Sequence, residues 1–142
     1  VTASAGLLSK VAKCHQFNTF TTPPGLQVAA AYGLSKQESY FKHLSKNFQK
    51  KRDLLSSGLE KIGFKTLKSE GTYFLTVDFR PLGFESSDEE FCRLITTKAG
   101  VSAVPISAFY RERAVNNYLR FCFCKRDTIL QEAIDRLANY FS

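Results

Sequence analysis

The pattern of apolar and polar positions changes character about halfway along the chain. Up to Gly63, apolar residues recur at spacings of three, four and seven, which is typical of helices with one buried face. The longest such run predicts a helix from about Lys36 to Lys61, and its apolar stripe is Tyr40, Phe41, Leu44, Phe48, Leu55, Leu59 and Ile62. Two shorter helices are predicted over residues 4–14 and 24–32, because the Pro23-Pro24 pair between them fits a helix start but not a helix interior.

After Gly63 the pattern favours short strands separated by two further helices. Strands are predicted over residues 64–67, 71–78, 101–104 and 118–123, which are rich in aromatic and β-branched residues. Ser87 and Glu90 form a capping box that opens one helix, and Asp127 is predicted to cap the last one. From Thr72 onward the order is β-α-β-β-α, which predicts an α+β fold with helices on one face of a small sheet.

One strand carries an arginine among apolar residues. Alternation along the strand places Tyr118, Arg120, Cys122 and Cys124 on one face and Leu119, Phe121 and Phe123 on the other. Arginine is rarely buried unless something pairs with it. Two interpretations stay open on these grounds: a structural ion pair with Asp78 or Glu112, or a site for an anionic ligand, since the guanidinium fork matches a carboxylate.

Length and composition are those of one soluble globular domain. The chain has 142 residues, of which 44% are apolar and 23% charged. No apolar run approaches the roughly 18 residues that a membrane helix needs, and the first residues lack the basic region of a secretory signal. The chain contains no methionine, even at position 1, so we expect it to be processed or a piece of a longer protein.

The four cysteines, Cys14, Cys92, Cys122 and Cys124, lack the spacing of a zinc site. We predict reduced thiols in the core, no metal, and therefore a reducing compartment. This favours the cytoplasm and leaves an organelle open. The two histidines, His15 and His43, have no acid–base–nucleophile set around them.

The net charge of +7 owes much to lysines and an arginine along the long predicted helix: Lys42, Lys46, Lys50, Lys51, Arg52 and Lys61. Such a stripe is usually a solvated helix face. The alternative is a small RNA-binding module, because the strand after Gly71 has aromatic residues and the element order suits that fold. Glu70 has the wrong charge for the RNA-recognition motif, and the Arg120 strand has no glycine.

Four strings of residues together resemble one enzyme family. They are His15–Pro23 with Gln27–Ala29, then Glu70–Phe74, then Gly100–Tyr110, and finally Leu119–Lys125. In this order and spacing the chain resembles the C-terminal part of class I/II aminotransferases, which are fold-type I enzymes that use pyridoxal 5′-phosphate. Within the family it is most similar to the branch of methionine aminotransferases and kynurenine–oxoglutarate or glutamine transaminases.

The resemblance implies roles for four residues. Arg120 matches the arginine that binds the substrate α-carboxylate, and Phe74 matches an aromatic residue that lines the substrate pocket. Phe20 and Thr21 match positions that reach the neighbouring subunit's active site in a homodimer. The kynurenine branch often has histidine at the Thr21 position, so the particular amino acid and 2-oxo acid stay open.

The resemblance also implies what lies elsewhere. The family's Schiff-base lysine follows a Ser-x-x-Lys-like motif, whereas Lys10 and Lys36 follow serines on helix-like segments without that context. The implied organisation is the end of the large domain in residues 1–35, a joining helix in 36–62 and the small domain in 63–142. Most cofactor ligands then lie upstream, and the isolated chain is expected to be inactive. A non-catalytic dimerisation or interaction fragment is the remaining alternative.

Overall fold

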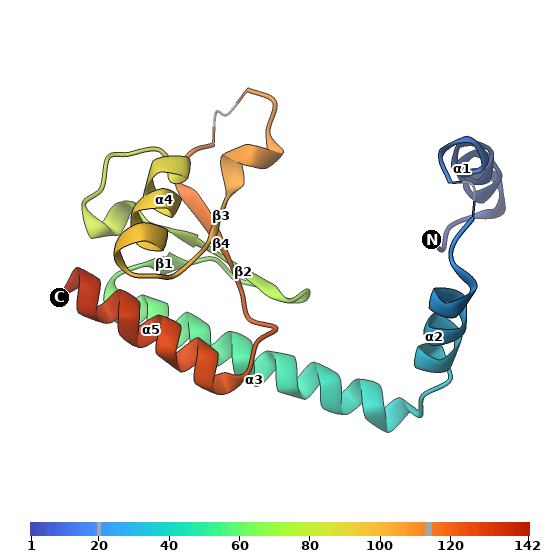
Figure 1. Ribbon diagram of the computed structural model, residues 1–142, viewed down its shortest axis with the longest axis horizontal. Helices are drawn as coiled ribbons and strands as arrows, with labels where there is room; N and C mark the ends of the chain where they lie inside the picture. Colours follow the sequence, from blue (N-terminus) through green and yellow to red (C-terminus); the bar gives the residue numbers. More distant parts are fainter. Residues whose placement is uncertain (20, 113–114) are drawn as a thin grey trace. The chain divides into compact units, whose positions relative to one another are not determined.

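The computed structural model describes residues 1–19, 21–112 and 115–142 (Figure 1). The chain divides into two compact units, unit 1 (Val1–Phe41) and unit 2 (Lys42–Ser142). Unit 1 contains helices α1 (Ala5–Asn18) and α2 (Pro24–Leu34). Helix α1 continues past His15, where we expected a break, because the next residue that a helix cannot accommodate is Pro23. None of the described residues of unit 1 is buried.

Unit 2 is built on a four-stranded antiparallel sheet. Its strands are β1 (Lys65–Thr66), β2 (Phe74–Asp78), β3 (Val104–Pro105) and β4 (Tyr118–Cys122), in the spatial order β1-β2-β4-β3. The outer strands β1 and β3 are shorter than predicted. The strand predicted over residues 101–104 stops before Pro105, yet Pro105 belongs to β3, since β3 is an edge strand, where a missing N–H costs little.

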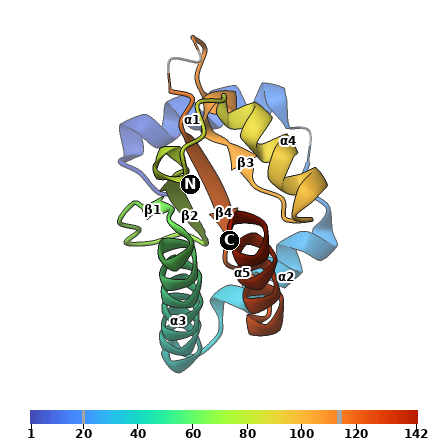
Figure 2. The same cartoon turned by 90° about the vertical axis from the view of Figure 1, so that its left-hand side faces the viewer.

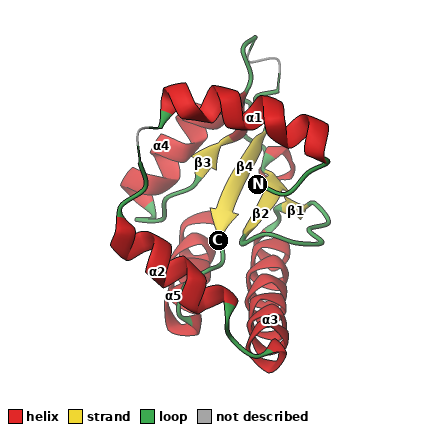
Figure 3. Ribbon diagram, turned by 90° about the vertical axis from the view of Figure 1, so that its right-hand side faces the viewer, coloured by secondary structure: helices red, strands yellow, loops and turns green. Residues whose placement is uncertain are grey.

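Three helices cover one face of this sheet, as Figures 2 and 3 show from opposite sides. They are α3 (Glu38–Ile62), which begins in unit 1, α4 (Asp88–Lys98) and α5 (Asp127–Phe141). Leu75, Val77, Leu119 and Phe121 point from β2 and β4 into the core, and Phe64 meets the rings of Phe91, Phe121 and Phe141 edge-on. The predicted α+β fold with helices on one face is therefore confirmed.

The helix ends show which local predictions hold. Ser87 and Glu90 form the predicted capping box at the start of α4. Asp127 does not cap α5: it is the first residue inside the helix, and its carboxylate pairs with Lys51 of α3. The stretch between the predicted strands 101–104 and 118–123 contains the short 3-10 helix η2 (Ile106–Phe109), and another, η1 (Arg80–Leu82), follows β2.

Candidate functional site

Arg120 lies at the centre of β4, on the sheet face opposite the core. It stands opposite Thr76 of β2 and Val104 of β3 in the two ladders. Its neighbours in the strand, Leu119 and Phe121, are buried on the helix side, so the alternation predicted from the sequence is confirmed. The guanidinium therefore lies on the half-buried side of the sheet, opposite the core.

Two aromatic rings contact the Arg120 guanidinium. Its central carbon lies 4.5 Å from the ring centroid of Phe74 in β2 and 4.7 Å from that of Phe109 at the end of η2. Each cation–π contact at a partly exposed site is worth about 0.5–1 kcal/mol and restricts where the guanidinium can lie. A ring contact leaves the five N–H donors of arginine available for an acceptor.

The carboxylate expected as a structural partner is occupied elsewhere. Asp78 accepts hydrogen bonds from the Arg80 Nε at 3.1 Å, from its Nη2 at 2.6 Å and from its backbone N–H at 3.0 Å. These bonds to Arg80 hold the pKa of Asp78 below its ordinary value, against the opposing effect of burial. Among residues 1–19, 21–112 and 115–142, no acidic side chain, Glu112 included, hydrogen-bonds or ion-pairs with Arg120. The ligand-site interpretation is thus favoured over the structural ion pair.

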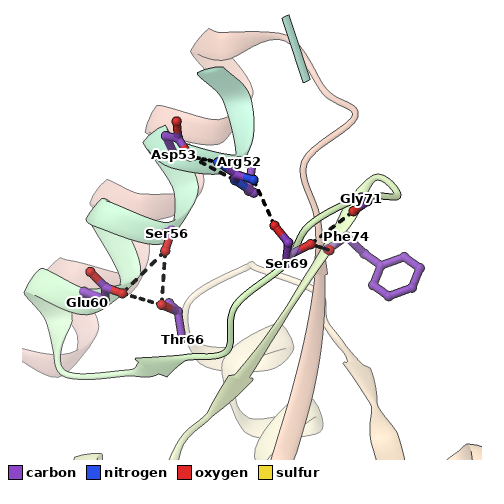
Figure 4. A network of polar contacts seen from close by, with 8 residues as sticks. All are labelled: Arg52, Asp53, Ser56, Glu60, Thr66, Ser69, Gly71 and Phe74. Carbon is purple, nitrogen blue, oxygen red and sulfur yellow. Dashed lines mark hydrogen bonds and ion pairs between the residues drawn. The ribbon is translucent and has the colours of Figure 1, made fainter. Parts of the chain in front are cut away.

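Phe74 is supported by polar contacts between α3 and the turn before β2 (Figure 4). Arg52 Nη1 donates to the Ser69 carbonyl at 2.8 Å, and the Ser69 hydroxyl lies 3.1 Å from the Gly71 carbonyl and 3.4 Å from that of Phe74. One turn further along α3, the Ser56 hydroxyl, the Glu60 carboxylate and the Thr66 hydroxyl bond to one another. The first set of contacts holds the turn before β2 against α3, and the second holds β1 against the same helix.

The four residues assigned by resemblance fall in different places. Phe74 and Arg120 are in contact on the same sheet face. Thr21 is exposed in unit 1 between α1 and α2, and Phe20 lies outside the described residues. Phe109 was not named as a site residue, because its contact with Arg120 joins two elements that only the fold brings together. Its position in the Gly100–Tyr110 string that carries the family resemblance was the available signal.

The prediction that the cysteines are core thiols is wrong for three of the four. All four are free, but only Cys92 is buried, where burial raises the pKa of its thiol to about 12. Cys122 and Cys124 have sulfurs 3.2 Å apart on the Arg120 side, because a strand sends alternate residues to one face. In the described parts of the chain, no three His, Cys, Asp or Glu side chains cluster as a metal site would require.

Comparisons with known proteins agree with this fold and identify the family. The sequence profile described as "Aminotransferase class I and II" matches residues 1–137. The chain is 38% identical to a probable N-succinyldiaminopimelate aminotransferase of Mycobacterium tuberculosis over 94% of its own length and 36% of that protein. It is 33% identical to the methionine aminotransferase of Escherichia coli, covering 95% and 35% of the two chains.

Solved structures give the same result. The N-succinyldiaminopimelate aminotransferase structure from M. tuberculosis superposes with a TM-score of 0.86 at 38% identity, over 99% of this chain and 36% of that one. The E. coli methionine aminotransferase does so with a TM-score of 0.81 at 33% identity, over 97% and 36%. The chain belongs to the class I and II aminotransferase family, and it spans about a third of the length of the relatives that it matches.

The family match and the exposure of the α3 lysines both bear on how the basic helix is interpreted. The profile accounts for nearly the whole chain, so the RNA-binding alternative has no support. The basic residues Lys42, Lys46, Lys50 and Lys61 are exposed on α3, as a solvated helix face requires. Within the described residues, no helix is both long and apolar enough to cross a membrane.

Proposed function

We propose that this chain is the C-terminal part of an aminotransferase and that Arg120 binds the α-carboxylate of its substrates. The observation that carries the proposal is a guanidinium held by two rings, with no carboxylate partner among the described residues, on the sheet face away from the core. The reaction would move an amino group from an amino acid to a 2-oxo acid, and both of these molecules carry the carboxylate that Arg120 would bind.

The geometry suits a carboxylate for physical reasons. A guanidinium and a carboxylate form two parallel charge-assisted hydrogen bonds, which fix both the position and the plane of the ligand. The rings of Phe74 and Phe109 restrict the guanidinium before the ligand arrives, so less side-chain freedom is lost on binding. A substrate anchored at its carboxylate presents its Cα–H bond in a defined direction, which lowers the entropic part of the barrier to proton loss.

The family's cofactor, pyridoxal 5′-phosphate, supplies an electron sink for the carbon that loses the proton. The described lysines considered as its anchor do not fit. Lys36 donates to the Tyr32 hydroxyl at 2.6 Å and lies over that ring, and Lys10 is exposed on α1. We propose that the cofactor is held mainly by polypeptide that this chain does not span, and that the isolated chain is inactive.

The organisation and substrates follow the same proposal. Residues 1–35 would be the end of the large domain, 36–62 the joining helix and 63–142 the small domain. Phe20 and Thr21 would reach the neighbouring active site of a homodimer. The amino donor would be of the methionine, glutamine, aromatic or kynurenine type. Relatives named for activity on methionine and kynurenine support two of these types, and another relative is named for N-succinyldiaminopimelate.

The test is to replace Arg120 with lysine or alanine in the full-length enzyme. Losing two charge-assisted hydrogen bonds should lower kcat/KM about 100-fold or more, with a higher KM for the amino acid and a lower kcat. Arg136→Gln is the matched control, since Arg136 pairs with Glu132 on the exposed side of α5 and should leave the kinetics unchanged. Unchanged kinetics for both Arg120 variants would remove the carboxylate assignment.

A second measurement isolates the carboxylate. The wild-type enzyme should discriminate strongly between an amino acid and the corresponding amine without its carboxylate. Arg120→Ala should lose most of that discrimination, because the variant no longer contacts the group by which the two compounds differ.

A further inference from the structure

The ring of Phe109 contacts Arg120 but has little packing of its own. It is 59% exposed, although its centroid lies 4.7 Å from the guanidinium carbon. A buried ring is held by many neighbours, whereas an exposed ring keeps its place only if its backbone is held. What fixes η2, the 3-10 helix that carries Phe109, therefore fixes one side of the Arg120 site.

Helix η2 is held by a buried carboxylate. Asp88, the first residue of α4, has 0% exposure. One of its oxygens accepts the backbone N–H of Ser107 and the other accepts the Ser107 hydroxyl, both at 2.7 Å. The Tyr110 N–H donates to the Ser107 carbonyl at 3.0 Å and closes the turn around Phe109. Asp88 is thus bonded to Ser107, and Ser107 is bonded to the other end of the turn that carries Phe109.

Asp88 also bonds to the chain just before β4. Its backbone N–H donates to the carbonyl of Asn116 at 2.9 Å, two residues before β4 begins. Asp88 therefore bonds both to Ser107, which follows β3, and to Asn116, which precedes β4. Its two bonds to Ser107 restrict the orientation of η2 as well as its distance, so they suit precise placement of a ring.

Core stability alone does not explain why a carboxylate is buried at position 88. Burying a carboxylate costs several kcal/mol, and well-packed apolar residues often serve stability equally well. Two hydrogen bonds from Ser107 and the positive end of α4 offset that cost for Asp88. These interactions are directional, and they position η2 in a way that an apolar contact would not.

We infer that Asp88 is a positioning residue that acts through Ser107 and Phe109 to orient the Arg120 guanidinium for its ligand. The inference rests on the proposed function only in taking that ligand to be a substrate carboxylate. Asp88 itself would contact neither substrate nor cofactor.

The test is a double-mutant cycle in the full-length enzyme with Asp88→Asn and Phe109→Leu. Each single variant should raise the KM for the amino acid about threefold to tenfold, with a smaller change in kcat. Asp88→Asn should add little in the Phe109→Leu background, because the ring through which it acts is already gone. Additive effects on KM, or no effect of Asp88→Asn on KM, would overturn the inference.

Two further variants keep the test informative. Ser107→Ala removes one of the two bonds and leaves the backbone bond, so it should act in the same direction as Asp88→Asn but more weakly. It keeps the inference testable if Asp88→Asn folds poorly. Asp135→Asn makes the same chemical change on α5, where the exposed carboxylate accepts from the Gln131 side chain, and should leave KM unaltered.

A spectroscopic readout separates this inference from the proposed function. In NMR spectra of the 142-residue chain, the side-chain signals of Arg120 should carry a ring-current shift from Phe109. Phe109→Leu and Asp88→Asn should both remove it, whatever Arg120 binds. If Asp88→Asn leaves the shift in place, the positioning role is wrong even where the Arg120 kinetics support a carboxylate site.

Discussion

Two arginines of unit 2, Arg80 and Arg120, differ in what their guanidinium groups contact. Arg80 lies two residues from Asp78, and η1 turns the chain so that its guanidinium meets that carboxylate. Arg120 has only ring contacts among the described residues, although Asp78 lies on a neighbouring strand. Because Asp78 bonds to its local partner Arg80, it does not pair with Arg120.

The Asp78–Arg80 pair should make stability depend on pH. In the 142-residue chain, Asp78→Asn should lower the free energy of unfolding by about 1–3 kcal/mol at neutral pH, since it removes the charge from a side chain that is only 6% exposed and accepts charge-assisted bonds from Arg80. The folded pKa of Asp78 is lowered, so its contribution is present above its unfolded pKa and is lost as the pH falls through the folded value.

Urea denaturation at neutral pH and at progressively lower pH would measure this effect. The difference between the wild-type chain and Asp78→Asn should shrink as the carboxyl group protonates. Asp135→Asn serves as a surface control with a difference near zero throughout. A difference that stays constant down to strongly acid pH would show that Asp78 acts through its shape and not through its charge.

At the scale of elements, α3 and α5 approach each other closely at one glycine. A Cβ added to Gly58 would lie 2.5–2.8 Å from three side-chain atoms of Ile134. The two helices form one layer against the sheet, so a shift at this contact would be transmitted to both. Gly58 is therefore needed for close approach, although glycine is a poor helix former.

Gly58→Ala should destabilise the 142-residue chain despite its better helix propensity. Alanine gains up to about 1 kcal/mol within a helix, whereas overpacking costs about 1–3 kcal/mol, so we expect a net loss. Thermal and urea denaturation would measure it. The double variant Gly58→Ala with Ile134→Val, compared with Ile134→Val alone, should show a smaller loss because a methyl group has been removed from the contact. A stabilised single variant would contradict the expected clash.

Elements whose signals are local were predicted well. The long apolar stripe predicted α3, and the Ser87–Glu90 spacing predicted the start of α4, because the atoms concerned lie within a few residues. The role of Asp127 was mispredicted because its partner, Lys51, comes from another helix. The short strands β1 and β3 were placed only approximately, since a two-residue strand exists by virtue of its neighbour.

For the whole molecule, burial is distributed unevenly between the two units. Every buried residue of the described chain lies between Leu55 and Leu137, whereas α1 and α2 have 14 and 11 residues and bury none. Helices of that length are marginal in water unless an apolar face packs against something. We propose that unit 1 packs against other parts of the full-length protein.

Hydrogen–deuterium exchange should show this difference directly. In the 142-residue chain, amides of β2 and β4 should exchange slowest and those of α1 and α2 fastest, with α5 as a reference helix inside unit 2. In the full-length enzyme, α1 and α2 should become protected. Equal protection of α1 and β4 in the 142-residue chain would contradict the proposed organisation.

The amino-acid sequence by itself determined the helices with strong periodicity, the face of the sheet on which Arg120 lies, and the family. These depend on spacing along the chain, and spacing is present before folding. Only the tertiary structure decided that Asp78 is taken by Arg80, that Phe109 contacts Arg120, and that Asp88 holds the segment carrying Phe109. Those contacts join residues from separate elements, so they exist only once the sheet has brought its strands and loops together.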